Sequence, residues 1–364
     1  MRRLLVQCRA IRNFLTNLLG LFGLSLLFSS AASGADVMEC AEQAAMGTPF
    51  KICLVTRQEQ VLNVAFDLKA AFKEIDRINQ WMSDWLPESE LSRVNRAAGA
   101  QAVVVSKELL EVVRETLAVA KASDGAMDPT FNVFFGLYRF KAGEEREPSA
   151  EEIAERLPLI DWKSVVLDEA KGTLSLKKPG MKLGLGAVGQ SYAADRVAEM
   201  LKSRGYRGGY VDGSGDTVFW GTKPDGAKWT TAIRDPRDKS KVILRIYGTD
   251  FAITTCGDDE KFFIKDGRRV HHVIDPKTGR PAGLSHQVTV IAKRGFDADA
   301  WDTAAFVMGP KKSKPVLESL GLRAVMVGID GAVTLTKGLT KRQTSWGEGY
   351  TVDDSNGEWK EVKK

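Results

Sequence analysis

Apolar side chains recur at helical spacing in two long stretches of the chain, and this periodicity restricts the folds open to it. Residues 62–82 carry one stripe, formed by Phe66, Phe72, Ile75, Ile78 and Met82. Residues 107–121 carry a second stripe, formed by Leu109, Leu110, Val113, Leu117 and Val119. Two further helices are predicted over about 190–204 and about 298–308, where Gly205 and Gly309 stop them. Each such stripe has to be buried against another element.

Short β-like runs follow the helical stripes along the chain. They lie at residues 208–211, 217–220, 229–233, 242–246, 288–291 and 324–327. The turn signals Asp225-Gly226 and Asp266-Gly267 separate neighbouring runs, which favours hairpins over βαβ units. A polar linker at 141–152 is expected to separate the helical part from the sheet-rich part and to be mobile. We therefore predict the α+β class, with a mixed, largely antiparallel sheet and helices packed on it.

The first 34 residues have the order of a secretory signal. Four arginines and no acid precede an apolar run at 14–28, and small residues follow, with Ala32 and Gly34 at the cleavage spacing. The run is interrupted by Asn17 and is shorter than the roughly 20 apolar residues that a membrane span needs. We expect a cleaved signal peptide at 1–34, one domain at 35–345 and a polar tail at 346–364. The expected location is the periplasm, without a lipid anchor, since no cysteine lies at the small-residue end of the signal, residues 29–35.

Charge and cysteine usage narrow the possible partners. Loss of the four signal arginines lowers the formal charge from +5 to +1. A nucleic-acid binder would need a basic stripe with aromatic stacking platforms, and neither is evident, so no nucleic-acid partner is expected. Cys40 and Cys53 could pair in an oxidising compartment and leave Cys256 free, and two unpaired thiols are an equal alternative.

The segment Asp297-Ala-Asp-Ala-Trp-Asp-Thr303 places three oxygen-bearing side chains within one helical turn. Residues three and four apart share a helix face, so Asp299 and Thr303 can converge on one hard cation, with Asp302 beside them. This geometry suggests a magnesium site. The alternative is an ordinary helix start, with Asp297 as the N-cap.

Three other features are candidates for ligand contact. The glycine-rich run Leu183-Gly-Leu-Gly-Ala-Val-Gly189 leads into a predicted helix and could offer free N–H groups to phosphate, or simply form turns. His272 is one of only three histidines and could act as a general base, or cap a turn. Trp85 lies just past a helix end, where its ring could stack on a flat ligand or belong to the core.

Taken in order, several short motifs resemble those of the bacterial FAD:protein FMN transferases, the ApbE family, once called thiamine biosynthesis lipoproteins. The matching pieces span residues 46 to about 309. They are Met46-Gly-Thr48, Met82-Ser83, residues 87–92 with Asn95, Ala126-Met-Asp-Pro-Thr130, residues 187–195, Gly215-Asp216, Thr255-Cys-Gly257, residues 272–281 and Ala298-Asp-Ala-Trp-Asp-Thr303.

The resemblance implies a role for individual positions. The FAD site would be lined by Met46, Trp85, Ala126, Met127, Asp128, Gln190 and Ile274. Magnesium would be held by Asp299, Thr303, the backbone carbonyl of Ala187 and Asp302. His272 would lie near an attacking hydroxyl of a threonine or serine on another protein.

The implied reaction transfers FMN from FAD to that hydroxyl and releases AMP. Magnesium suits it because the ion draws charge off phosphate oxygens. The implied acceptors are flavin-bearing subunits of membrane respiratory complexes, with association at the outer face of the inner membrane. An FAD pyrophosphatase, a non-catalytic FAD-binding or delivery protein and a secreted interaction domain are the alternatives.

Four positions depart from the family pattern. Gly184 stands where an aspartate usually contacts the flavin cofactor, and Gln190 replaces a charged residue. Cys256 stands for a common serine, and Asp259 for a common tyrosine. We therefore expect Gly184→Asp to tighten FAD binding.

Overall fold

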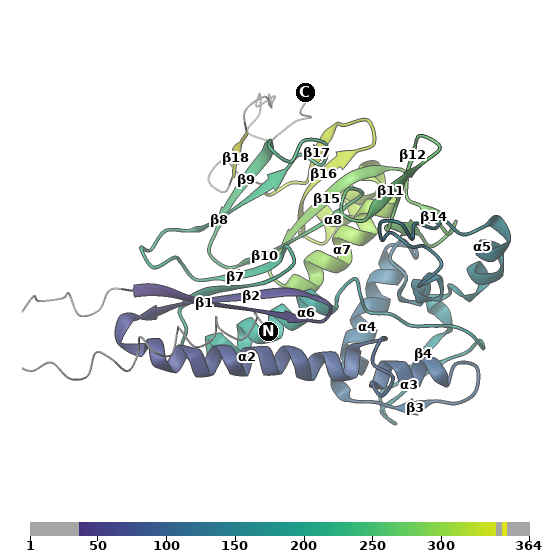
Figure 1. Cartoon of the computed structure of the whole chain (residues 1–364), viewed down its shortest axis with the longest axis horizontal. Helices are drawn as coiled ribbons and strands as arrows, with labels where there is room; N and C mark the ends of the chain where they lie inside the picture. The colour runs from purple at the N-terminus through teal and green to yellow at the C-terminus, as the bar shows by residue number, and fades with distance from the viewer. Residues whose placement is uncertain (1–35, 340–343, 348–364) are drawn as a thin grey trace, which may run out of the picture. The chain divides into compact units, whose positions relative to one another are not determined.

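The computed structural model describes residues 36–339 and 344–347. The predicted signal peptide and almost all of the predicted tail lie outside the described residues. The described part is α+β, as predicted, and its largest element is an eight-stranded sheet in which every neighbouring pair is antiparallel (Figure 1). In sheet order the strands are β1 (Asp36–Ala45), β2 (Thr48–Arg57), β6 (Gly208–Gly213), β7 (Asp216–Trp220), β10 (Phe251–Gly257), β15 (Ser285–Ala292), β16 (Arg323–Gly328) and β17 (Val333–Leu335).

One face of this sheet is covered by helices. They are α2 (Val61–Met82), α6 (Gly189–Ser203), α7 (Gly295–Met308) and α8 (Pro310–Ser319), and α4 (Lys107–Ala122) packs against α7. Figure 1 shows α2 and α6 running below β1 and β2. The other face is covered by a three-stranded sheet of β8 (Trp229–Arg234), β9 (Val242–Gly248) and β18 (Thr344–Trp346).

Alternation along each strand divides the core between the two faces. On β10, Ala252 and Cys256 pack with the helices, whereas Phe251 and Ile253 pack with the three-stranded sheet. Successive strand residues point to opposite faces, so a strand that is covered on both sides is apolar throughout. Cys256 therefore faces α7, which carries the predicted metal ligands.

A smaller layer lies beside the long helices. It contains α3 (Glu90–Arg96), α5 (Ala150–Arg156) and a sheet of β3 (Val103–Val104), β5 (Thr173–Leu176) and β4 (Val165–Asp168), with the 3-10 helices η2 (Pro129–Phe134), η3 (Leu157–Leu159) and η4 (Trp162–Ser164). Another 3-10 helix, η1 (Gln58–Gln60), joins β2 to α2. Two hairpins complete the described part, β11 (Phe262–Lys265) with β12 (Arg268–His271), and β13 (Ile274–Asp275) with β14 (Arg280–Pro281). Within this part of the chain, no helix is both long and apolar enough to cross a membrane.

Several sequence predictions need correction. Phe66 was assigned to the buried stripe of α2 but is 76% exposed. Asp225-Gly226 closes no hairpin, because β7 and β8 belong to different sheets. Asp266-Gly267 does close one, and both residues have a positive φ, 51° and 73°.

The predicted mobile linker at 141–152 is structured instead. Ser149 and Glu152 form a capping box that starts α5. The Glu147 side chain is only 4% exposed and lies within ion-pair distance of Lys265, Arg268 and Arg280. The linker is held by this long-range contact, which its polar composition does not reveal.

The cysteine question is settled by strand pairing. Cys40 and Cys53 stand opposite one another on β1 and β2 and form a disulfide. Cys256 is a free, buried thiol.

Candidate active site

The predicted metal ligands lie on the face of α7 that packs against the sheet. Asp299 and Asp302 are both buried, and Asp216 reaches them from the first position of β7. Burial raises the pKa of Asp299 well above its ordinary value, and the charge of Asp302 raises it further. Burial and the neighbouring carboxylates raise the pKa of Asp302 and Asp216 in the same way.

We call Asp216, Asp299 and Asp302 the acidic cluster, and its negative charges are not balanced by nearby cations among the described residues. The charged groups that act most strongly on it are other carboxylates, including Asp195 and Glu260. Buried like charges destabilise one another unless a cation lies between them. The cluster therefore favours a bound cation.

The donor atoms around the cluster are oxygens. The Thr303 hydroxyl donates to Asp302 Oδ1 at 3.2 Å, and the Ser191 hydroxyl donates to Asp299 Oδ2 at 2.5 Å. Among the described residues, no three His, Cys, Asp or Glu side chains form a metal site by themselves. The predicted set differs from such a site, because it combines two carboxylates with the hydroxyl of Thr303 and the carbonyl of Ala187. Oxygen donors of this kind fit Mg²⁺, so the residues present suit the ion.

Asp195 positions this part of α7, and the sequence prediction missed it. The structure starts α7 at Gly295, three residues before the predicted start. The Asp195 carboxylate, which comes from α6, accepts hydrogen bonds from the N–H groups of Gly295 and Phe296 at 2.7 and 2.9 Å. The alternative interpretation of this segment took Asp297 as the N-cap. The N-cap position is Arg294 instead, and the capping carboxylate, Asp195, comes from another helix.

The glycine-rich run leads directly into α6. No side chain caps the first turn of α6, so N–H groups near Gln190 are available to an anion. A Cβ on Gly189 would lie 3.0 Å from Met82 Sδ and 3.4 Å from Met46 Cε. The absence of a side chain at position 189 therefore lets both methionines approach the start of α6.

Met46 lies at the tip of the β1–β2 hairpin. It has a φ of 49° and is followed by Gly47 at 80°, so the pair forms the two-residue turn between the strands. The Cys40–Cys53 disulfide crosslinks the same two strands. The hairpin thus brings Met46 next to Gly189 at the start of α6.

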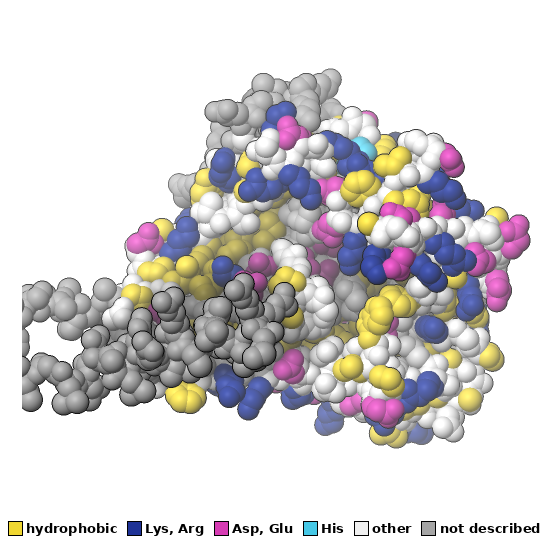
Figure 2. All heavy atoms as spheres, viewed as in Figure 1, with side chains coloured by type: hydrophobic (Ala, Val, Ile, Leu, Met, Phe, Trp, Pro, Cys, Tyr) yellow, Lys and Arg dark blue, Asp and Glu magenta, His cyan; other side chains and the backbone are white. Residues whose placement is uncertain are grey.

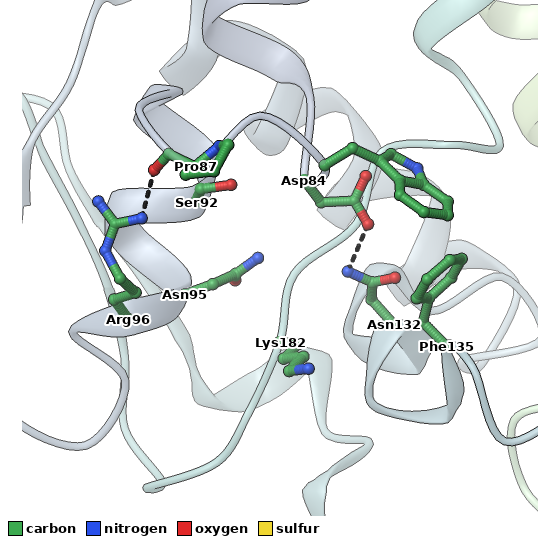
Figure 3. Close-up of a pocket in the computed structure, with 9 residues that line it drawn as sticks. Asp84, Pro87, Ser92, Asn95, Arg96, Asn132, Phe135 and Lys182 are labelled. Carbon is green, nitrogen blue, oxygen red and sulfur yellow. Dashed lines mark hydrogen bonds between the residues drawn. The ribbon is translucent and has the colours of Figure 1, made fainter. Parts of the chain in front are cut away.

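An open pocket of about 260 Å³ lies at the other end of the glycine-rich run (Figure 3). Trp85 lines it, is 70% exposed, and packs edge-on against Phe135 with ring centroids 4.4 Å apart. Trp85 is therefore no core aromatic and its ring is free to meet a ligand. Figure 3 shows Asp84 and Asn132 pointing toward one another, and Asn132 Nδ2 donates to Asp84 Oδ2 at 2.9 Å.

Gly184 borders this pocket, and the structure gives a reason for glycine there. An added Cβ would lie 2.7 Å from Asn132 Cγ and 2.9 Å from Asn132 Cβ, which is closer than real Cβ contacts. The space that an aspartate would need at position 184 is filled by Asn132 in this chain. The expected gain in FAD affinity from Gly184→Asp therefore has to overcome a steric conflict.

Three predicted FAD residues, Ala126, Met127 and Ile274, have side chains in the core. Their side chains are therefore not open to a ligand in this structure. The Asp128 carboxylate accepts hydrogen bonds from the N–H groups of Thr130 and Trp162 and from the Thr130 hydroxyl. Burial raises the pKa of Asp128, and these donors oppose the rise. Asp128 thus fixes the start of η2, directly after Ala126 and Met127.

His272 follows β12 directly and is held in the neutral form. Burial lowers its pKa to about 4, and the nearby charge of Lys261 contributes. Its Nε2 lies 3.9 Å from Glu260 Oε2, whereas Nδ1 is buried and has no hydrogen-bond partner within the described residues. Nε2 is therefore the nitrogen that a substrate can reach.

Glu260 links His272 to the acidic cluster, and the sequence prediction missed it. Its negative charge acts on Asp216, Asp299 and Asp302, and its carboxylate is the one near His272 Nε2. Glu260 lies four residues after Cys256 in a loop, and no sequence pattern there indicates a functional role for it.

The two remaining departures lie close by. Cys256 is buried at the cluster, where the Thr303 hydroxyl is a side-chain hydrogen-bond partner of its thiol. Burial raises the pKa of Cys256 and so keeps it a thiol. Asp259 forms an ion pair with Lys239 at 3.0 Å. None of the departures removes an oxygen donor from the predicted metal site.

Comparisons with known proteins identify the family of this chain. Residues 46–326 match the model of the ApbE family. The FAD:protein FMN transferase of Escherichia coli (strain K12) is 31% identical over 268 residues, which cover 71% of this chain and 75% of that protein. The crystal structure of the ApbE protein of Thermotoga maritima matches with a TM-score of 0.76 and 31% identity, and covers 83% of this chain and 97% of that one.

A third comparison comes from Pseudomonas stutzeri. Its flavinyl transferase ApbE, in the apo form, matches with a TM-score of 0.72 and 27% identity, and covers 83% of this chain and 95% of that chain. Sequence and fold thus agree over the same elements that carry the acidic cluster, the glycine-rich run and His272, and this chain belongs to the ApbE family.

Proposed function

We propose that this protein is a magnesium-dependent FAD:protein FMN transferase. The observation that carries the proposal is the convergence of the acidic cluster, the uncapped start of α6 and a neutral histidine in one site. The names of the relatives, FAD:protein FMN transferase and flavinyl transferase, support the choice of reaction.

Different groups of residues suit different parts of FAD. The free N–H groups at the start of α6 suit the two phosphates of FAD, since the helix dipole favours negative charge there. Trp85, with an open face, suits stacking of a flat ring. Mg²⁺ held by Asp299, Asp302, Thr303 and the Ala187 carbonyl would neutralise charge on the phosphate oxygens.

The transfer step requires one base and one leaving group. The oxygen of a threonine or serine hydroxyl on the acceptor forms a bond to the FMN-side phosphorus. The bond between that phosphorus and the bridging oxygen breaks, and its electron pair leaves with AMP. His272 Nε2 takes the hydroxyl proton, and the carboxylate of Glu260 stabilises the imidazolium that forms.

We further propose that the protein is exported and acts outside the inner membrane, on flavin-bearing subunits of membrane respiratory complexes. The Cys40–Cys53 disulfide supports an oxidising compartment, because such bonds are rare in reducing ones. The signal-like composition of residues 1–34 supports export.

The decisive experiment incubates residues 35–364 with FAD, Mg²⁺ and a purified flavin-acceptor domain. A fluorescent acceptor band and a mass gain equal to FMN minus water, both absent when EDTA replaces Mg²⁺, are the expected results. Free FMN and AMP without an adduct would instead indicate an FAD pyrophosphatase. Intact bound FAD would indicate a carrier.

A further inference from the structure

The β11–β12 hairpin stands apart from the larger sheets. Its two strands pair only with each other, through the register Phe262 with His271 to Lys265 with Arg268. Its last residue, His271, directly precedes His272. At about 3.3 Å per strand residue, the hairpin tip lies within about 17 Å of His272. A protein that presents a hydroxyl to His272 therefore has this hairpin beside it.

The hairpin carries an excess of positive charge. Residues 261–271 contain four cations, Lys261, Lys265, Arg268 and Arg269, and one carboxylate, Asp266. In the space-filling view, dark blue side chains gather over the region that Figure 1 labels β11, β12 and β14 (Figure 2). The charge of the chain without its predicted signal is close to neutral, so this local excess is a property of the surface.

One buried carboxylate does not neutralise that excess. Lys265, Arg268 and Arg280 lie 3.2, 2.8 and 3.3 Å from oxygens of Glu147. Three cations around one carboxylate have a net positive charge. The side chains of Lys265 and Arg268 are also 51% and 54% exposed. These groups can still meet anions from solution.

The same hairpin exposes apolar side chains. Ile264 is 60% exposed and Phe262 is 37% exposed, two positions apart on one face. The Arg269 guanidinium lies 3.8 Å from the centre of the Phe262 ring. Arginine, aromatic and aliphatic groups together are typical of protein interfaces.

We propose that the hairpin surface is the docking site for the acceptor protein. It is formed by Phe262, Ile264 and Arg269 on one face of the hairpin and by Lys265 and Arg268 on the opposite face. Its partner is a segment that carries acidic residues and at least one apolar side chain next to the modified threonine or serine. This inference rests on the proposed function and adds the chemistry of its second substrate. Charge complementarity and the closeness of the hairpin to His272 select the acceptor over other occupants.

The test uses three variants of the exported chain. Ile264→Ser and Arg268→Gln each remove one contact from the hairpin surface, and Arg268→Gln leaves Lys265 and Arg280 with Glu147. Lys171→Gln is the matched control, because it removes an exposed cation from the β4–β5 turn. FMN transfer to the purified acceptor domain is followed at varied acceptor concentration, together with the Kd for FAD.

The expected result is an increase of about 10-fold in the KM for the acceptor in Ile264→Ser and Arg268→Gln. The kcat at saturating acceptor and the Kd for FAD stay within about 2-fold of the wild type, which a general loss of folding would not allow. An acceptor whose acidic residues near the modified site are changed to amides should show the same rise in KM with the wild-type enzyme. Lys171→Gln should leave every parameter unchanged.

Four outcomes overturn the proposal, and they are distinguishable. Unchanged KM in both hairpin variants, with a wild type that transfers FMN, refutes the docking site and leaves the proposed function intact. A wild type that transfers no FMN refutes both. Hairpin-dependent sedimentation with vesicles of 30% anionic phospholipid, without a change in KM, assigns the surface to a membrane. A concentration-dependent dimer that the variants abolish, again with unchanged KM, assigns it to a second copy of this chain.

Discussion

Replacement of Gly184 is the sharpest test of the site geometry. The sequence favours Gly184→Asp as a change that restores a family contact with the flavin. In the structure the new Cβ would lie 2.7 Å from Asn132 Cγ, although ordinary contacts begin at 3.4 Å. Overpacking of this kind costs about 1–3 kcal/mol, and loss of the Asp84–Asn132 hydrogen bond adds about 1 kcal/mol.

We therefore expect Gly184→Asp to lower the free energy of unfolding by about 2–4 kcal/mol and not to tighten FAD binding. Urea denaturation and fluorescence titration with FAD measure the two effects. Gly186→Ala is the control, since nothing lies within 4 Å of its added Cβ, and it should change stability by less than about 1 kcal/mol.

A double variant separates steric conflict from other causes. Asn132→Gly removes the three atoms, Cγ, Cβ and Oδ1, that would lie 2.7, 2.9 and 3.0 Å from the new Cβ. If Asn132 is the obstacle, Gly184→Asp costs at least about 1 kcal/mol less in the Asn132→Gly background than in the wild type. A Gly184→Asp single variant that is as stable as the wild type and binds FAD more tightly would refute the reasoning.

Three further predictions follow from the same structure. Asp299→Asn should lower the rate of FMN transfer by at least about 100-fold. The Tm measured without Mg²⁺ should stay unchanged or rise, because burial and Asp302 raise the pKa of Asp299, so that its ionised form opposes folding. A fall in Tm would contradict this. The pKa of His272 is lowered to about 4 in the folded protein, so as the pH falls the imidazole is protonated in the unfolded chain before it is protonated in the folded one. The neutral form of His272 therefore contributes at most about 3 kcal/mol to the free energy of unfolding above pH about 6.5, and this contribution is lost as the pH falls toward 4. The difference in unfolding free energy between wild type and His272→Gln should change over that interval, and a constant difference would count against the pKa assignment. Reduction of the Cys40–Cys53 disulfide, which closes a separation of 13 residues, should lower the free energy of unfolding by about 3 kcal/mol, as measured by urea denaturation with and without reductant.

Local patterns predicted the elements well where one residue type dominates a face. The stripes at 62–82 and 107–121 became α2 and α4, and all six β-like runs lie in strands. Phe66 matches the apolar stripe of α2 but is exposed. Periodicity shows which residues share a helix face, but it does not show whether another element packs against each of them. The metal ligands could be proposed from spacing because Asp299, Asp302 and Thr303 lie on one turn of one helix.

Contacts between distant segments could not be predicted in this way. Asp195 caps α7 across a separation of 100 residues, and Glu147 holds three cations from the far hairpins. Asn132 fills the space beside Gly184, although 52 positions separate them in the chain. No local pattern contains such pairs, because a side chain at one position gives no sign of its partner in space.

The sequence by itself determined the helices α2, α4, α6 and α7 and six of the strands, since these depend on period and on residue type within a few positions. It also led to the proposed set of oxygen donors. Only the tertiary structure decided that Cys40 and Cys53 are bonded, that Trp85 is open to solvent, and that Glu260 connects His272 to the acidic cluster. Pairing, exposure and charge coupling depend on distances through space, and packing of the sheet against its helices sets those distances.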